Sequence, residues 1–510
     1  MTHSPFDSKT ETLDEFFTWR AAVDPDALAF AHDEESVSLT YAELYEQASA
    51  LAAGLIRMGV RPGDRVALLL PAGLDFVRAF WAVQRAGAVS VAFNPYTPAP
   101  TAVRRAMRVR PVLTLLASID EEFAREAEAA GLRCSAFGDL PQVSGETPPV
   151  NVDPEAFTFF QPTSGTSGES RAVMIRQRNI MALLRGYTEA NYIDTSDVLV
   201  SWVPPWHDLG LVRFVAGPVY NGVPCYIVTP SIQTIPKWLE TITRVRGTIS
   251  GAPDFAYRLA ARFGDPAKID LSSIRWMTNG GEPVRASTIE AFETRFGTRG
   301  IVAPRYGLAV ATLGLTFVEP SSPSRVDDRG NVGCGKPMAG IDVKIDGGGT
   351  GEILVRGYGV FAGYFDAEEA TAETLRDGWL HTGDIGHLDD DGELYILGRQ
   401  RAMLKRGGAV LAPREVEEAA HNGEGVRLAA AVGMTRQDDS MTEEIVLVIE
   451  VDPKFEQHDS IAAAVAQEVH RVIGFAPDRV VVLPPRTIPR TYNGKIRHAA
   501  LRKELEQRMA

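Results

Sequence analysis

Small and hydroxyl residues follow the apolar pair Phe159 and Phe160 in the segment FFQPTSGTSG, residues 159–168. In such a loop, backbone N–H groups and side-chain hydroxyls can converge on phosphate oxygens, because the glycines have no Cβ to block the approach. The segment lacks the Gly-Lys-Ser/Thr of a Walker loop and the glycine spacing of a dinucleotide fingerprint. Taken alone, a flexible turn explains it equally well.

An ordered series of polar and glycine-containing motifs follows this loop. Taken singly, each has a plain structural explanation, since a lysine after glycine is usually a solvated turn and a tyrosine before glycine usually packs. Taken in order, the motifs favour one shared site. They are WHDLGL (206–211), SGAPDFAY (250–257), NGGEPV (279–284), YGLA (306–309), GWLHTGD (378–384), GR (398–399) and PRTYNGK (489–495).

This series resembles the adenylate-forming superfamily of acyl-CoA synthetases, peptide-synthetase adenylation domains and luciferases. The HDLGL and NGGEPV elements look most like those of the fatty acyl-AMP ligases, and the resemblance runs from about Thr40 to Lys495. It implies that an acid attacks the α-phosphate of ATP, which releases pyrophosphate and leaves a mixed anhydride with AMP. ATP and Mg²⁺ are the implied cofactors, and positioning and electrostatic stabilisation would supply most of the catalysis.

The resemblance also implies roles for individual residues. Lys495 and His207 would be the catalytic residues: Lys495 would bridge the α-phosphate and the attacking carboxylate, and His207 would shape the wall between the acyl and nucleotide sites and touch the α-phosphate side. Asp384 would accept the ribose hydroxyls with help from Arg399, and Tyr306 would stack on adenine. The remaining ATP or AMP contacts would be Thr163, Ser164, Gly165, Thr166, Ser167, Gly168, Arg171, Asn279, Gly280, Gly281 and Glu282, and the substrate pocket would be formed by Trp206, His207, Arg213, Phe214 and Ala252.

Three positions depart from the family pattern. Val310 stands where the family has a glutamate that coordinates Mg²⁺, and a valine side chain cannot bind a hard cation, so the metal ligands are unknown. Arg171 replaces the lysine of the phosphate loop and keeps its charge. Ala402 replaces the hinge aspartate, so the inter-domain rotation of relatives could be altered.

The acyl pocket departs as well, because Arg213 and Phe214 stand where the fatty acyl-AMP ligases have two glycines. A ring and a guanidinium there should shorten an apolar tunnel and add positive charge. The span from Phe317 to Gly333 is too short for the insertion typical of those ligases. We therefore expect a small or polar acid as substrate. The alternative is that Arg213 points outward and Phe214 fills the core.

The leading hypothesis is an AMP-forming ligase that passes the activated acid to an amine, to CoA or to carrier-protein pantetheine. One alternative is a diazotase-type ligase that activates nitrite, a small oxyanion, for an aromatic amine. Another is a fatty acyl-AMP ligase or acyl-CoA synthetase. A third is a nucleotide-binding protein without turnover, although Lys495, Asp384 and Arg399 argue against it.

The composition narrows the classes of protein that this chain could be. It has 510 residues, a net charge of −14 and only three cysteines. The acidic balance argues against a nucleic-acid binder, and the scattered cysteines argue against a disulfide framework. We find neither an export signal nor an apolar run long enough to span a membrane, so we expect a cytoplasmic protein without a membrane partner.

Local patterns predict the elements that must position these motifs. Thr12 with Glu15 and Thr40 with Glu43 form capping boxes at the start of two helices. Apolar runs at 65–70 and 89–93 flank a helical pattern at 75–86, and this alternation predicts an α/β fold with largely parallel sheets. We expect an N-terminal core of residues 1–398 with two α/β subdomains and a β subdomain at about 333–398. A small mobile α+β lid would follow at 399–510.

Overall fold

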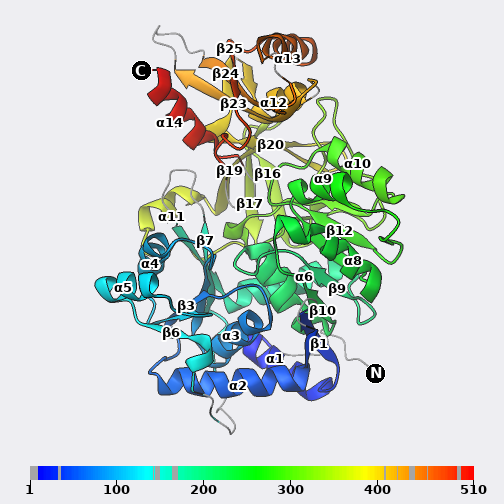
Figure 1. Cartoon of the computed structure of the whole chain (residues 1–510). Helices are drawn as coiled ribbons and strands as arrows, with labels where there is room; N and C mark the ends of the chain where they lie inside the picture. The colour runs from blue at the N-terminus through cyan, green and yellow to red at the C-terminus, as the bar shows by residue number, and fades with distance from the viewer. Residues whose placement is uncertain are drawn as a thin grey trace.

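The structure is a computed structural model that describes residues 10–32, 36–141, 143, 150–163, 171–406, 409–421, 423–435, 443–455, 458–490 and 496–509. Two large, mainly parallel sheets form the N-terminal half, and smaller, mostly antiparallel sheets follow along the chain (Figure 1). The predicted α/β class is therefore confirmed. Among the described residues, no helix combines the length and apolar character needed to cross a membrane.

The first large sheet has six strands in the order β6-β5-β3-β4-β7-β8. All neighbours are parallel except β7 and β8, which pair antiparallel through residues 157–163 and 171–176. The helices α4 and α5 pack on one face, while α2 and α3 pack on the other. The elements are β3 (Arg65–Leu69), β4 (Val89–Ala92), β5 (Leu113–Leu116), β6 (Cys134–Ala136), β7 (Phe157–Thr163), β8 (Arg171–Arg176), α2 (Tyr41–Arg57), α3 (Leu74–Arg85), α4 (Ala99–Met107), α5 (Glu121–Ala130) and the short helix η2 (Phe137–Asp139).

The second large sheet has seven strands in the order β13-β12-β11-β9-β10-β1-β2, and only β1 and β2 pair antiparallel. The helices α8, α9 and α10 cover one face, and the other face packs into the core shared with the first sheet. The strands are β1 (Leu28–His32), β2 (Val37–Thr40), β9 (Leu199–Ser201), β10 (Cys225–Ile227), β11 (Ile249–Ala252), β12 (Trp276–Asn279) and β13 (Val302–Pro304). The helices are α1 (Leu13–Val23), α6 (Gln177–Ala190), the π-helix η3 (Leu209–Ala216), α7 (Gly217–Asn221), η4 (Ile232–Thr234), α8 (Ile235–Val245), α9 (Asp254–Phe263) and α10 (Ala286–Phe296).

An antiparallel sheet forms the predicted β region. Its path is β16-β17-β19-β18, with β20 paired to β19, and a short ribbon of β14 and β15 precedes it. This region contains the strands Ile341–Ile345 and Gly351–Gly357, which pair antiparallel. The elements are η5 (Ala309–Ala311), β14 (Thr316–Phe317), β15 (Lys336–Pro337), β16 (Ile341–Ile345), β17 (Gly351–Gly357), α11 (Glu368–Thr374), β18 (Leu375–Arg376), β19 (Trp379–Leu388) and β20 (Leu394–Arg399).

The C-terminal part lies at the top of Figure 1 and builds a three-stranded sheet with helices on both faces. Alternate residues of β23 and β24 pack against α12 and α13 on one face and against α14 on the other. The predicted boundary between residues 398 and 399 stays a prediction. The elements are η6 (Gln400–Ala402), β21 (Leu404–Arg406), β22 (Ala409–Leu411), α12 (Pro413–His421), β23 (Val426–Thr435), β24 (Glu443–Val451), α13 (His458–Ile473), β25 (Arg479–Leu483) and α14 (His498–Met509).

Both predicted capping boxes are present. The Thr12 hydroxyl accepts the backbone N–H of Glu15, and the Glu15 carboxylate accepts the N–H of Thr12, at 3.4 and 3.2 Å. Thr40 and Glu43 make the same exchange at 3.2 and 2.8 Å. These local signals fix where α1 and α2 begin, and so set the first layer of the core.

Candidate active site

Several predicted site residues lie at the carboxyl edge of the seven-stranded sheet. Ala252 ends β11 and Asn279 ends β12, and the two are direct partners across the parallel ladder. Tyr306 follows β13, and Trp206 follows β9. Carboxyl ends of neighbouring parallel strands share one edge, which is where open α/β sheets bind their ligands.

Trp206 lies where the two large sheets meet. The side-chain amide of Gln161, on β7 of the six-stranded sheet, donates to the Trp206 carbonyl at 3.0 Å. The ring of Tyr96, which follows β4, meets the Trp206 ring edge-on with 5.9 Å between centroids. These contacts join the carboxyl edges of both sheets around a single buried residue.

Tyr306, Asp384 and Arg399 come together from distant parts of the sequence. The Tyr306 hydroxyl donates to Asp384 Oδ2 at 2.6 Å, and Arg399 Nε pairs with Asp384 Oδ1 at 2.8 Å. Asp384 and Arg399 are opposite one another on β19 and β20, so the sheet register fixes the ion pair. Burial, reinforced by the Asp384 carboxylate, raises the pKa of the Tyr306 phenol well above its ordinary value.

This arrangement holds the Asp384 carboxylate in a fixed orientation. Asp384 is also only 5% exposed, so further hydroxyl donors would bind it away from bulk water. The geometry suits a group with paired hydroxyls.

The NGGEPV motif forms the turn after β12. The Asn279 amide donates to Asp254 Oδ1 at 3.1 Å, and the Glu282 carboxylate accepts the N–H of Phe255 at 2.6 Å. Burial raises the pKa of Glu282 to about 7, and the neighbouring Asp254 acts in the same direction. A Cβ on Gly280 would lie 2.8 Å from the Arg305 carbonyl oxygen, so glycine lets the two backbones approach.

His207 and Asp208 lead into a π-helix, an uncommon form that is often found at functional sites. Asp208 Oδ1 accepts the N–H of Leu209 at 2.8 Å and so caps η3. Burial raises the pKa of the Asp208 carboxyl, and His207 opposes this shift. The capping contact assigns Asp208 a structural task, while the catalytic role of His207 stays a prediction.

The side chains of Arg213 and Phe214 have different surroundings. Arg213 is 3% exposed, and its guanidinium carbon lies 4.3 Å from the Tyr187 ring centre and 4.8 Å from that of Trp276. The alternative in which Arg213 points outward is therefore wrong. Phe214 packs in the core beside Phe76 and Val77, next to a cavity of about 10 Å³. That space is at the limit for one water molecule.

The sequence interpretation missed three residues beside Arg213. Arg305 is 6% exposed, and its guanidinium carbon lies 4.3 Å from the Trp276 ring centre and 5.3 Å from that of Tyr187. Arg305 Nη1 donates to the Tyr187 hydroxyl at 2.8 Å. A charged residue directly after the apolar strand residues Ile301–Pro304 was the available signal.

The predicted phosphate loop is described only at its two ends. Thr163 ends β7 and Arg171 begins β8, and the Thr163 hydroxyl donates to the Arg171 carbonyl at 3.2 Å. The Arg171 guanidinium lies 5.5 Å from the centre of the Tyr364 ring. Ser164, Gly165, Thr166, Ser167, Gly168 and Lys495 lie outside the described residues.

The described residues do not fit the implied Mg²⁺ site. Val310 lies in the turn η5, where its carbonyl accepts the N–H of Phe361 at 2.9 Å and its side chain offers no oxygen. In the part of the chain that the structure describes, no group of three or more His, Cys, Asp or Glu side chains could hold a metal ion.

Comparisons with known proteins give a consistent result. Residues 17–365 match the family model described as AMP-binding enzyme. The medium-chain-fatty-acid–[acyl-carrier-protein] ligase JamA of Moorena producens is 28% identical, and the match covers 92% of this chain and 90% of JamA. The long-chain-fatty-acid–AMP ligase FadD28 of Mycobacterium tuberculosis is 27% identical over 93% of both chains. A solved structure from a study of fatty acyl-adenylate ligases from E. coli and L. pneumophila has a TM-score of 0.86, 27% identity and 98% coverage of both chains.

Proposed function

The chain belongs to the AMP-binding enzyme family and is an AMP-forming ligase, and we propose that it adenylates a small or polar acid. The activated group would then pass to an amine or to a thiol such as CoA or carrier-protein pantetheine. The convergence of Tyr306, Asp384 and Arg399 is the observation that supports the adenylation site most directly.

In this proposal, Asp384 accepts the two ribose hydroxyls of ATP while Arg399 holds its carboxylate in place. Tyr306 and the turn Asn279–Glu282 flank the adenine. The segment between Thr163 and Arg171 binds the leaving pyrophosphate, and Lys495 stabilises charge on the α-phosphate as the acid attacks. No step is assigned to Mg²⁺, because the described residues do not offer its ligands.

Arg213 supports a polar substrate over a long alkyl chain. A buried guanidinium is a poor neighbour for an apolar tail, because the tail offers the charged N–H groups no acceptor. Phe214 also fills core space beside a cavity of only about 10 Å³. JamA and FadD28 are named for fatty acids, so a fatty acid remains the comparison substrate in any assay.

Nitrite activation is a second candidate, and the same buried cation favours it. A small planar oxyanion would be a suitable acceptor for the Arg213 fork. Pyrophosphate release that required nitrite and an aromatic amine, and that no carboxylic acid supported, would select this candidate.

The proposal is tested by measuring pyrophosphate release with a panel of acids, with nitrite included. Lys495→Ala should abolish release, because the positive charge on the α-phosphate would be lost, while thermal unfolding should change little. Full activity of this variant would refute the role of Lys495. ATP binding without pyrophosphate release for any acid or for nitrite would leave only nucleotide binding without turnover.

A further inference from the structure

Four buried side chains form a cluster that we call the two-arginine subsite: Arg213 of η3, Arg305 after β13, Tyr187 of α6 and Trp276 of β12. Both guanidinium carbons lie between 4.3 and 5.3 Å from the same two ring centres. Tyr187 and Trp276 meet edge-on, with 6.2 Å between ring centroids. The rings and the two cations therefore form one packed unit.

The two cations lack sufficient hydrogen-bond acceptors. In both Arg213 and Arg305, Nε and Nη2 are buried without a hydrogen-bond partner. Unpaired buried donors on a charged group are costly, so native proteins nearly always provide them with an acceptor. Each guanidinium also lies near the other, and this repulsion adds to the effect of burial, which lowers the pKa of Arg213 to about 10.

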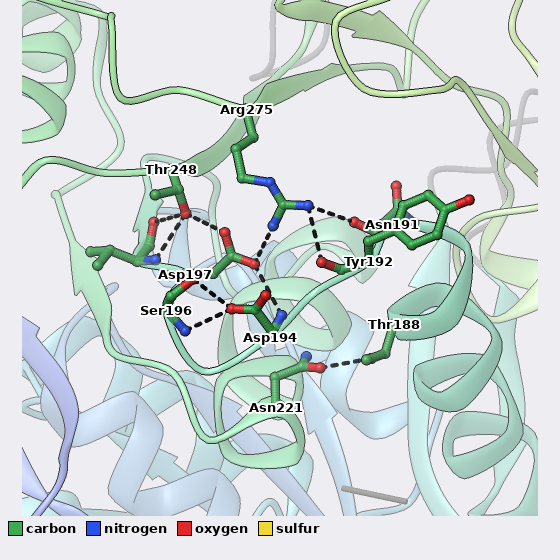
Figure 2. A network of polar contacts seen from close by, with 10 residues as sticks. Thr188, Asn191, Tyr192, Asp194, Ser196, Asp197, Asn221, Thr248 and Arg275 are labelled. Atoms are coloured by element: carbon green, nitrogen blue, oxygen red, sulfur yellow. Dashed lines mark hydrogen bonds and ion pairs between the residues drawn. The ribbon is translucent and has the colours of Figure 1, made fainter. Parts of the chain in front are cut away.

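The carboxylate of Asp197, which acts on Arg213 electrostatically, already has two hydrogen-bond donors. Asp197 accepts Arg275 Nη1 and the Thr248 hydroxyl, each at 2.6 Å (Figure 2). Arg275 also donates to the carbonyls of Asn191 and Tyr192, at 3.4 and 3.0 Å. Figure 2 shows Asp197 between Arg275 and Thr248, so its carboxylate is hydrogen-bonded to these two residues and not to Nε or Nη2 of Arg213.

The geometry points to a second carboxylate of the substrate as the missing acceptor, so that the acid this enzyme activates is a small dicarboxylic acid. This inference rests on the proposed adenylation and names its substrate class. One carboxylate would lie between the forks of Arg213 and Arg305, and the other would attack the α-phosphate. Guanidinium forks match the two oxygens of a carboxylate, which makes such contacts short and strong.

The two-arginine subsite is adjacent to the predicted nucleotide residues. Arg305 directly precedes Tyr306, and the two side chains have different partners, Tyr187 and Asp384. The Arg305 N–H donates to the Asn279 carbonyl at 3.0 Å, which ties its backbone to the end of β12. Arg305 is therefore placed to contact the far end of an acid whose near end is adenylated.

The test measures ATP–pyrophosphate exchange with matched pairs of acids: dicarboxylic acids from malonate to adipate, and monocarboxylic acids of the same carbon number. Nitrite is a separate arm. We expect the wild type to favour one dicarboxylic acid over its matched partner. Arg213→Met and Arg305→Met should each lower kcat/KM for that acid by about 10- to 100-fold, mainly through KM, because each removes charged hydrogen bonds.

Arg85→Met is the matched control. Arg85 is also a buried arginine stacked on a tyrosine, 4.0 Å from the Tyr45 ring centre, but it has its own carboxylate, Asp14, at 3.1 Å. This variant should keep the wild-type ratio of dicarboxylic to monocarboxylic activity, whatever happens to its stability. Preference for monocarboxylic acids or nitrite, or an unchanged ratio in both subsite variants, would overturn the inference.

A binding measurement separates the two-arginine subsite from the catalytic proposal. If no acid and no nitrite supported exchange, the proposed function would fail. Calorimetry with the same dicarboxylic acids and a non-hydrolysable ATP analogue would then show whether the two-arginine subsite binds a dicarboxylic acid. Binding to the wild type that is lost when Arg213 and Arg305 are both replaced by methionine would support the subsite. Equal binding, or no binding, would overturn it.

Discussion

Buried arginines occur both near the first helices and in the two-arginine subsite, and their surroundings differ. Arg20 is fully buried; it pairs with Asp24, and its Nε and Nη2 donate to the carbonyls of Val219 and Tyr220, each at 3.1 Å. Arg213 is almost equally buried and stacks on two rings, yet two of its nitrogens have no hydrogen-bond partner.

This difference separates two uses of the same side chain. Arg20 completes its hydrogen bonds within the chain, so it serves the fold by tying α1 to α7. Arg213 and Arg305 have donors left over, which weakens the fold and suits a binding partner. Sites that bind ligands commonly give up stability in this way.

Breaking the ion pair of Arg20 with Asp24 should produce the largest loss of stability. Asp24→Ala removes the carboxylate that is paired with Arg20, a fully buried cation. We expect a loss of about 3–5 kcal/mol in the free energy of unfolding, measured in urea. Asp26→Ala, at a nearby exposed residue, should change it by less than about 0.5 kcal/mol. A loss at Asp24 no larger than at Asp26 would contradict the comparison.

Supplying the missing acceptor should produce the next largest effect. At about 100 times its Kd, the preferred dicarboxylic acid should stabilise the wild type by about 2.7 kcal/mol, seen as a higher Tm. At the same acid concentration the increment should fall to about 0.4–1.4 kcal/mol in Arg213→Met, and it should persist in Arg85→Met. An equal gain in stability in all three proteins would show that the acid binds outside the two-arginine subsite.

Removing the Arg213 cation should have a smaller effect on the free energy of unfolding than Asp24→Ala has, and should raise it rather than lower it. Arg213→Met loses stacking on Tyr187 and Trp276, but it also removes two buried unpaired N–H groups and the repulsion from Arg305. We expect the free energy of unfolding without ligand to rise by about 1 kcal/mol, because the desolvation term is the larger one. A loss of several kcal/mol would show that Arg213 serves the fold, as Arg20 does.

The last prediction concerns the pH dependence of stability at Glu282, a carboxylate that lies beside another carboxylate, Asp254. Its folded-state pKa of about 7 lies above its ordinary value of 4.5. The folded protein therefore holds this proton more tightly than the unfolded chain does. Its contribution to stability is complete below pH about 4.5 and is lost as the pH rises to about 7. Glu282→Gln should weaken the pH dependence of the unfolding free energy between about pH 4.5 and 7. A pH dependence equal to that of the wild type would contradict the assignment of this effect to Glu282.

Local patterns predicted much of the fold, because they depend on neighbouring residues alone. The capping boxes at Thr12 and Thr40 are set by hydrogen bonding within a few residues, and the strand Arg65–Leu69 is set by its run of apolar side chains. The family resemblance is confirmed by the comparisons, since several motifs had to occur in one order along the whole chain.

The two-arginine subsite could not be predicted in the same way. Tyr187, Arg213, Trp276 and Arg305 come from a helix, a π-helix, a strand and a strand end, and only the packed sheet brings them together. Arg213 stands where the fatty acyl-AMP ligases have glycine, whereas the local signal at Arg305 is only a charge directly after an apolar strand. The ion pair of Asp384 with Arg399 likewise depends on the register of β19 and β20.

The adjacency of Arg305 and Tyr306 constrains how substrate choice can diverge in this scaffold. In our proposal Arg305 contacts the acid and the next residue, Tyr306, contacts the nucleotide, and the absence of a Cβ on Gly280 lets the Arg305 carbonyl lie against the turn after β12. A change that shifts this backbone would disturb recognition of both molecules at once. Arg213 is carried by a separate helix, so new acids are more easily accommodated by varying η3 than by varying the end of β13.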